Sequence, residues 1–136
     1  MLIREFISET NKNKMISDLL KYYKVGSVKV KQKSMKDHAH YNVDTGTLEL
    51  STRYKTIKNR QLKEFLITII HEIYHAMDAK KYGWKRFKKM YELEMNYQIS
   101  MDKDEYDDNK YEIKAEEFGQ KNWKKWKNKF KKQGLI

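Results

Sequence analysis

The chain has 136 residues, carries a formal net charge of +11 and contains no cysteine. This length suits one modest core, so we expect a single domain over residues 1–136. Disulfides and thiolate zinc sites are excluded, which leaves His, Asp and Glu as metal ligands. Charges interrupt the N-terminus where a secretory signal is apolar, and no run approaches the roughly 18 apolar residues of a membrane span. We therefore expect a cytoplasmic protein without a transmembrane segment.

The first half of the chain has the pattern of a helix followed by a small sheet. Apolar residues recur at helical spacing from Leu2 to Tyr23, which predicts an amphipathic helix. Period-two alternation and a turn at Asp44–Gly46 then predict three short strands, over residues 28–31, His40–Val43 and Thr47–Ser51. We expect these strands to form a small antiparallel sheet.

The second half is predicted to be helical. Apolar residues at helical spacing predict a buried helix from Lys58 to Lys81, a helix around Trp84–Glu94 and a last helix over Lys110–Lys132. The acidic stretch Met101–Asn109 is typical of a solvated loop. An EF-hand in this stretch is excluded, because Ile113 would stand where the closing glutamate belongs. The predicted fold class is α+β.

Residues 71–75, with the sequence His-Glu-Ile-Tyr-His, lie in the middle of the buried helix. His71 and His75 are four residues apart and share a helical face, so one ion can bind both, with Glu72 beside it. Two histidine ligands and a neighbouring carboxylate are what a zinc hydrolase needs. The alternative is a chance pattern of ordinary core or surface histidines. The apolar surroundings favour the metal, because buried polar side chains are costly without a partner.

A third ligand is expected further along the chain, since catalytic zinc has three protein ligands and one open position. Glu112 and Glu116 are four residues apart on the last predicted helix, with the small Ala115 allowing close helix packing. Glu112 is the candidate ligand, and Glu116 is the candidate acceptor for the free ring N–H of a metal-bound histidine. The alternative is an ordinary charged helix face.

Residues 71–78 (His-Glu-Ile-Tyr-His-Ala-Met-Asp) and 112–118 (Glu-Ile-Lys-Ala-Glu-Glu-Phe) together resemble the gluzincin metallopeptidases. The nearest likeness is to lethal-factor-type toxin domains and to small phage and bacterial metallopeptidases. This resemblance implies Zn²⁺ held by His71, His75 and Glu112, with Glu72 as general base. It also implies a phage or mobile-element origin.

Three further residues have alternative interpretations. Asp78 either orients a ligand of the metal or is a helix-surface acid; the resemblance, which also has an acid here, favours the first. Tyr106 is a candidate for stabilising the oxyanion, because it shortly precedes Glu112. Residues 82–90 are loosely similar to the third-ligand segment of Spartan-type proteases, which act on DNA-bound proteins, but Tyr82 stands where that family has histidine.

The segment Lys121–Lys132 contains seven lysines and no acid, with Trp123, Trp126 and Phe130 on one helical face. We expect this aromatic stripe to pack on the core while the lysines face water. The alternatives are a weak, non-specific contact with nucleic acid or a membrane surface, or neutralisation by the acidic loop.

The sequence therefore predicts a zinc metallopeptidase that hydrolyses protein or peptide substrates. Glu72 would take the proton of the attacking water, and Thr47–Ser51 would serve as an edge strand that pairs with an extended substrate. The rival hypothesis is a non-catalytic protein with a structural or vestigial metal site that binds DNA or an acidic partner through its basic surface.

Overall fold

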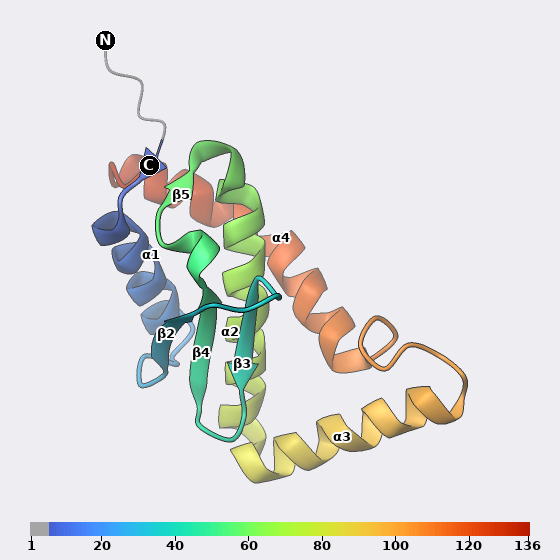
Figure 1. The fold of residues 1–136 in the computed structure, drawn as a ribbon. Coiled ribbons are helices and arrows are strands. Elements are labelled where there is room, and N and C mark those ends of the chain that lie inside the picture. The colour runs from blue at the N-terminus through green and yellow to red at the C-terminus, as the bar shows by residue number, and fades with distance from the viewer. Residues whose placement is uncertain (1–5) are drawn as a thin grey trace.

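The computed structural model describes residues 6–136 and has an α+β fold, as the sequence predicts (Figure 1). Its strands are β1 (Phe6–Ile7), β2 (Lys29–Lys33), β3 (Ala39–Asn42), β4 (Thr47–Ser51) and β5 (Ile57–Lys58). Its α-helices are α1 (Glu9–Tyr22), α2 (Leu62–Tyr82), α3 (Trp84–Ser100) and α4 (Lys110–Lys132). Two 3₁₀ turns, η1 (Thr52–Tyr54) and η2 (Asn59–Gln61), flank β5.

Two helices begin later than the sequence predicts. Ser8 caps α1 by accepting a hydrogen bond from the amide of Asn11, and the preceding residues form β1 and pair with β5. The predicted helical residues 2–5 lie outside the described part. The helix predicted from Lys58 begins at Leu62, because β5 and η2 occupy the intervening residues. The bounds of α4 agree with the prediction.

The three-stranded sheet has the order β2-β4-β3, with β2 parallel and β3 antiparallel to β4. The hairpin joining β3 to β4 is confirmed, and its turn closes with a hydrogen bond from the Gly46 amide to the Asn42 carbonyl. The prediction of an antiparallel sheet is wrong. The chain reverses direction before β3 and again before β4, so β4 has the direction of β2, and it lies between β2 and β3. The prediction that Thr47–Ser51 is an edge strand is also wrong. In this sheet the edges are β2 and β3.

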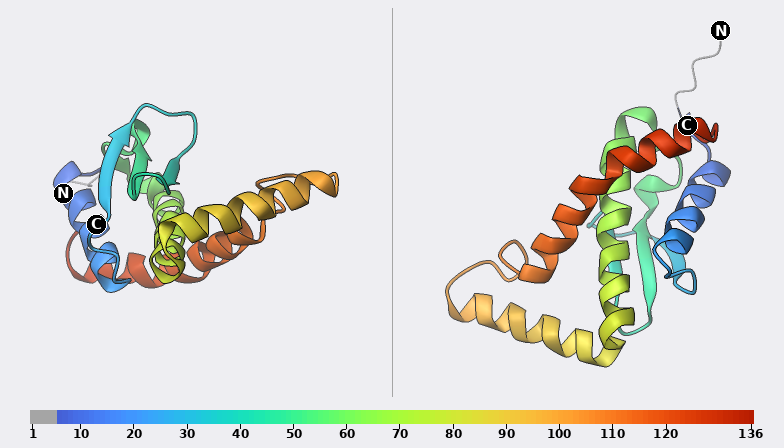
Figure 2. Two further views of the ribbon diagram at one scale, coloured as in Figure 1. Left: turned by 90° about the horizontal axis from the view of Figure 1, so that it is seen from below. Right: turned by 180° about the vertical axis from the view of Figure 1, so that it is seen from behind.

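Helix α2 lies between the sheet and α4, and its apolar side chains form much of the core (Figure 2). Phe65, Leu66, Ile69, Ile70 and Ile73 are completely buried. Burying each such side chain contributes roughly 1.5–3 kcal/mol. This packing holds α2 in one orientation between the sheet and α4, which fixes the direction in which the buried polar side chains of the helix point.

Helix α3 projects away from the sheet, and the 101–109 loop returns the chain to α4, so that α2, α3 and α4 form three sides of a triangle (Figure 2). The change of direction occurs at Gly83, whose φ of +83° is accessible to glycine at little cost. Helix α3 continues to Ser100, beyond the predicted end at Glu94.

Helices α2 and α4 approach closely because α4 carries small residues at the contact. Ala115 is completely buried, and a Cβ atom at Gly119 would lie 2.8 Å from the carbonyl oxygen of Ile67. A larger side chain at either position would separate the helices. The small residues thus set the spacing between the acidic residues of α4 and the histidines of α2.

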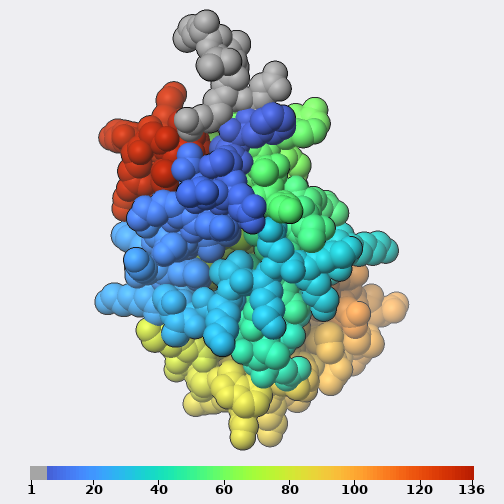
Figure 3. Space-filling view, turned by 60° about the vertical axis from the view of Figure 1, so that its left-hand side comes forward, coloured from blue at the N-terminus to red at the C-terminus, as the bar shows by residue number. Residues whose placement is uncertain are grey.

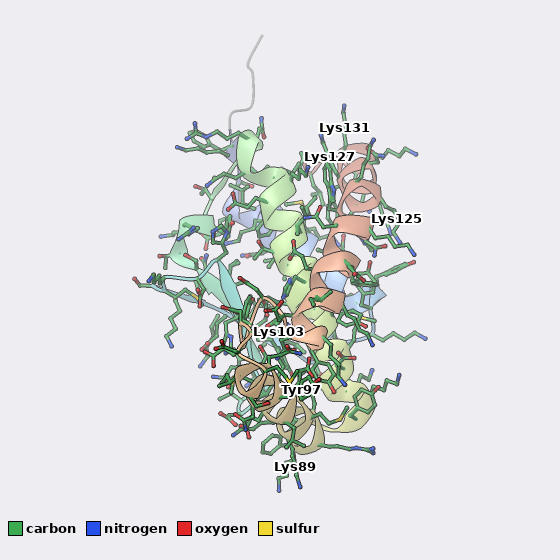
Figure 4. All side chains as sticks on the ribbon, turned by 90° about the vertical axis from the view of Figure 1, so that its right-hand side faces the viewer. Lys89, Tyr97, Lys103, Lys125, Lys127 and Lys131 are labelled. Atoms are coloured by element: carbon green, nitrogen blue, oxygen red, sulfur yellow. The ribbon has the colours of Figure 1, made fainter. Side chains whose placement is uncertain are left out.

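The C-terminal half of α4 packs on the core as predicted. Trp126 and Phe130 are buried, and the indole N–H of Trp126 donates to the Tyr23 hydroxyl at 2.9 Å. This half of α4 lies beside α1 (Figure 3). The labelled lysines Lys125, Lys127 and Lys131 project outward (Figure 4). None of the helices within residues 6–136 has the length and apolar character to span a bilayer.

Candidate metal centre

Two imidazoles from α2 and one carboxylate from α4 converge on a common point. One potential ligand atom from each of His71, His75 and Glu112 lies within 4.8 Å of the others, and all three residues are buried. The Oε1 atom of Glu112 is 2.9 Å from His71 Nε2 and 2.5 Å from His75 Nε2. Two nitrogen donors and one oxygen donor match the chemistry of divalent transition-metal sites. This group could hold a metal ion.

The orientation of His71 is fixed by Glu116 on the next turn of α4. The His71 Nδ1–H donates to the Glu116 carboxylate at 2.9 Å, which leaves Nε2 directed at the metal position. Burial lowers the pKa of His71, but the hydrogen bond to Glu112 and the nearby carboxylates outweigh it and raise this pKa to about 9. The metal-free imidazole therefore carries a positive charge at neutral pH.

Glu112 has a partner for each of its carboxylate oxygens. Burial alone would raise its pKa, but hydrogen bonds from His71 and His75 hold the pKa well below its usual range. The second oxygen, Oε2, accepts a hydrogen bond from the Tyr91 hydroxyl at 2.8 Å. Glu112 is therefore an ionised, oriented carboxylate, as a metal ligand must be.

Tyr91 is the residue of this site that the sequence analysis misses. It lies on α3, where its ring contacts His75 edge-on and stacks on Tyr111. Burial and the charge of Glu112 raise the pKa of Tyr91, so it remains a hydrogen-bond donor. The chain contains 10 tyrosines, and no local pattern distinguishes this one.

Glu72 lies beside the two histidines and is only 6% exposed. Its Oε2 atom accepts a hydrogen bond from the backbone amide of Tyr41 on β3 at 2.8 Å. Burial raises the pKa of Glu72, and the nearby His75 and His71 partly oppose this shift. A carboxylate with a raised pKa that adjoins a metal position is suited to accept and return a proton.

The remaining predicted residues lie around this centre. Tyr106 lines the same groove as Glu72, and burial together with the Glu112 charge raises its pKa. Asp78 is half-buried one turn beyond His75, but His75 Nδ1 has no hydrogen-bond partner within residues 6–136. Tyr82, at the Spartan-type ligand position, does not belong to the His-His-Glu group.

The candidate metal centre opens into a groove with a volume of about 1460 Å³. One side is the unpaired edge of β3, and the other sides are α3, the 101–109 loop and α4. The groove reaches His71, Glu72 and His75 on α2. A molecule much larger than water can therefore approach the three ligand atoms.

Comparison of the chain with protein-family models, curated proteins and solved structures finds no match. The features of this chain that bear on function are therefore its own geometry: a buried His-His-Glu group, a buried carboxylate beside it and an open groove above them.

Proposed function

We propose that the protein is a zinc-dependent endopeptidase of the gluzincin type. The observation that carries the proposal is that His71 and His75 on α2 meet Glu112 on α4 while Glu72 lies next to them in the same groove. A purely structural metal site has no use for such a carboxylate. Structural zinc sites are also closed by four protein ligands, whereas three residues form the group within residues 6–136.

The residues of the chain have distinct roles in this proposal. A bound zinc ion lowers the pKa of water and polarises a carbonyl group. Glu72 accepts the proton of the attacking water and returns it to the leaving amine. Glu116 keeps His71 in the tautomer that directs Nε2 at the metal, and Tyr91 holds Glu112. Tyr106 lines the groove with its hydroxyl as the candidate donor to the oxyanion.

Strand β3 is the expected binding edge for an extended substrate. The carbonyl groups of His38 and Asn42 accept hydrogen bonds from the amides of Ser51 and Gly46, on the side of β4. The alternate residues Ala39 and Tyr41 therefore direct their backbone groups to the other side, toward the groove. The Tyr41 amide is already bonded to Glu72, so an added peptide would pair with the Ala39 backbone and the Tyr41 carbonyl. A peptide that adds to this edge would lie across the metal centre.

Metal content is the first test. Inductively coupled plasma mass spectrometry on untagged wild-type protein should find about one zinc per chain, with loss in His75→Ala and in Glu112→Ala. Casein hydrolysis by the zinc-loaded protein should then fall at least a hundredfold in Glu72→Gln, which keeps its zinc. Wild-type protein that binds no metal after zinc is added would contradict the proposal.

The second candidate is a non-catalytic protein that binds nucleic acid. It is favoured by the lysines of α4, none of which forms an ion pair within the described part of the chain. Lysine-rich surfaces without arginine bind phosphates with little base specificity. Full cellular function in Glu72→Gln, together with loss of function on replacing Lys125, Lys127 and Lys131, would favour this candidate.

A further inference from the structure

The groove above the metal centre has a charge opposite to that of the whole protein. Eight of the chain's 19 acidic residues line it, but only three of its 30 lysines and arginines. One of those three, Lys88, is neutralised by Asp44 at 2.7 Å. The positive charge of the protein therefore lies almost entirely outside the groove, and negative charge collects within it.

Several of these carboxylates form no salt bridge with a lysine or arginine of residues 6–136. Asp37, Glu92, Asp107 and Glu117 are exposed and form no ion pair with any lysine or arginine in residues 6–136. They come from four separate segments: the turn before β3, α3, the 101–109 loop and α4. The unpaired negative charges thus surround the groove and are not confined to one helix face.

The lining between these carboxylates is largely apolar. Val43, Phe87, Met95 and Ile113 contribute aliphatic and aromatic surface from three sides. Lysine and arginine combine a long apolar stem with a cationic end. Such a side chain can lie along this apolar surface and place its charge among the carboxylates at the rim.

We propose that the groove binds an extended peptide segment carrying lysine or arginine side chains, placed along the free edge of β3. The inference rests on the proposed function, since the peptide is the substrate of that site, and it names the substrate class. Net charge alone predicts the opposite preference, for acidic peptides. At physiological ionic strength, charges are screened beyond roughly 8 Å, so the carboxylates at the rim determine the choice.

Peptide binding without cleavage tests the inference. The zinc-loaded Glu72→Gln protein is titrated into labelled ten-residue peptides of alternating lysine–alanine, glutamate–alanine or serine–alanine, with fluorescence anisotropy as the readout. Wild-type protein kept metal-free by a chelator is the second inactive form. We expect the lysine peptide to bind at least tenfold more tightly than the other two in both forms.

Matched variants locate the binding site. Added to the Glu72→Gln protein, the pair Glu92→Gln and Glu117→Gln removes one charge from each side of the groove. We expect this to weaken lysine-peptide binding about three- to tenfold, as for the loss of two exposed ion pairs. The control pair, Glu9→Gln and Asp18→Asn on α1, changes the net charge equally but lies outside the groove, so binding should be unchanged.

The inference is overturned if the glutamate or serine peptide binds as tightly as the lysine peptide, or if both pairs of substitutions weaken binding equally. Failure of the proposed function gives a different result. A protein that binds the lysine peptide but hydrolyses no peptide with zinc bound retains the groove preference and loses the peptidase assignment. Hydrolysis confined to acidic peptides would retain the peptidase assignment and contradict the groove preference for lysine.

Discussion

Both ring nitrogens of His71 lie 2.9 Å from carboxylate oxygens, Nδ1 from Glu116 and Nε2 from Glu112. An imidazole donates to two carboxylates only when it is protonated, in agreement with the raised pKa of His71. In the metal-free protein, a proton on His71 therefore supplies part of the positive charge that a bound cation would bring. The raised pKa of His71 and the lowered pKa of Glu112 are two expressions of this one interaction.

The metal-free protein should therefore lose stability as the pH rises from about 6.5 to 9. His71 has a pKa raised from 6.5 to about 9, so its contribution is complete below pH 6.5 and lost as pH rises through the folded-state value. Each pKa unit corresponds to about 1.4 kcal/mol, so the loss is at most a few kcal/mol. Urea denaturation in the presence of a chelator, at pH 6 to 9.5, measures it.

Saturating zinc provides the control for this pH dependence. A metal ion requires neutral histidine ligands, so the decline above pH 6.5 should disappear in the zinc-bound protein. Glu112 acts in the opposite direction. Its pKa is lowered from 4.5, so its contribution is present above pH 4.5 and is lost as the pH falls further. If the free energy of unfolding of the metal-free protein does not change between pH 6.5 and 9, the prediction for His71 is contradicted.

Among the secondary-structure elements, α3 projects from the sheet but still contacts the candidate metal ligands. Through Tyr91 it reaches the second oxygen of Glu112, and through Phe87 it packs against His75. The helix therefore supports the candidate metal centre through Glu112 and His75, in addition to forming one wall of the groove. A substitution in α3 that removes these contacts should therefore lower the affinity for metal.

Replacing Tyr91 with phenylalanine should weaken zinc binding about 10- to 100-fold, the usual cost of losing a hydrogen bond to a metal ligand. The ring and its stacking on Tyr111 are retained, so the free energy of unfolding of the metal-free protein should fall by about 1.5–3 kcal/mol, the cost of losing one hydrogen bond to a charged group. Competition with a fluorescent zinc chelator measures the affinity. Tyr97→Phe, at an exposed position of the same helix, is the matched control and should bind zinc as the wild type does.

The contact between α2 and α4 is set by Gly119. In Gly119→Ala the added Cβ would lie 2.8 Å from the Ile67 carbonyl oxygen, so the helices must separate. Overpacking costs about 1–3 kcal/mol and exceeds the gain of about 1 kcal/mol from better helix propensity. We expect net destabilisation of about 1 kcal/mol in urea denaturation, with weaker zinc binding. Gly26→Ala is the control, because the atom nearest to its added Cβ is 3.9 Å away. Equal destabilisation by both substitutions would contradict the close contact at Gly119.

Across the whole molecule, the candidate metal site joins parts of the chain that are distant in sequence. His71 and His75 are 41 and 37 residues from Glu112. Tyr41, whose amide donates to Glu72, is 31 residues before Glu72. A metal ion bound here would connect α2 to α4. Unfolding must release the ion, so metal binding contributes directly to the stability of the fold.

Removal of the metal should therefore lower the melting temperature. A ligand at 100 times its Kd stabilises the folded state by about 2.7 kcal/mol, which corresponds to several degrees for a chain of this size. Differential scanning calorimetry of wild-type protein with zinc and with a chelator should show the difference. In His75→Ala the two melting temperatures should coincide, whereas an equal difference in both proteins would indicate zinc bound elsewhere.

The features that could be predicted before the fold was known are those that depend on local spacing. The face shared by His71 and His75, the pair of Glu112 and Glu116 and the buried aromatic stripe of α4 all follow from the 3.6-residue period of a helix. The period-two alternation likewise predicts strands at the right places. Local periodicity does not encode which strand becomes a neighbour, so the mixed sheet and the central position of β4 could not be predicted.

Contacts between distant groups depend on how the whole chain packs. Tyr91 on Glu112, the Tyr41 amide on Glu72 and the acidic lining of the groove each join elements separated by 20 residues or more, so they depend on the path of the whole chain. That path is set by the burial of α2 between sheet and α4 and by the change of direction at Gly83. The candidate metal ligands are predicted from a motif, whereas the contacts that support them arise from packing.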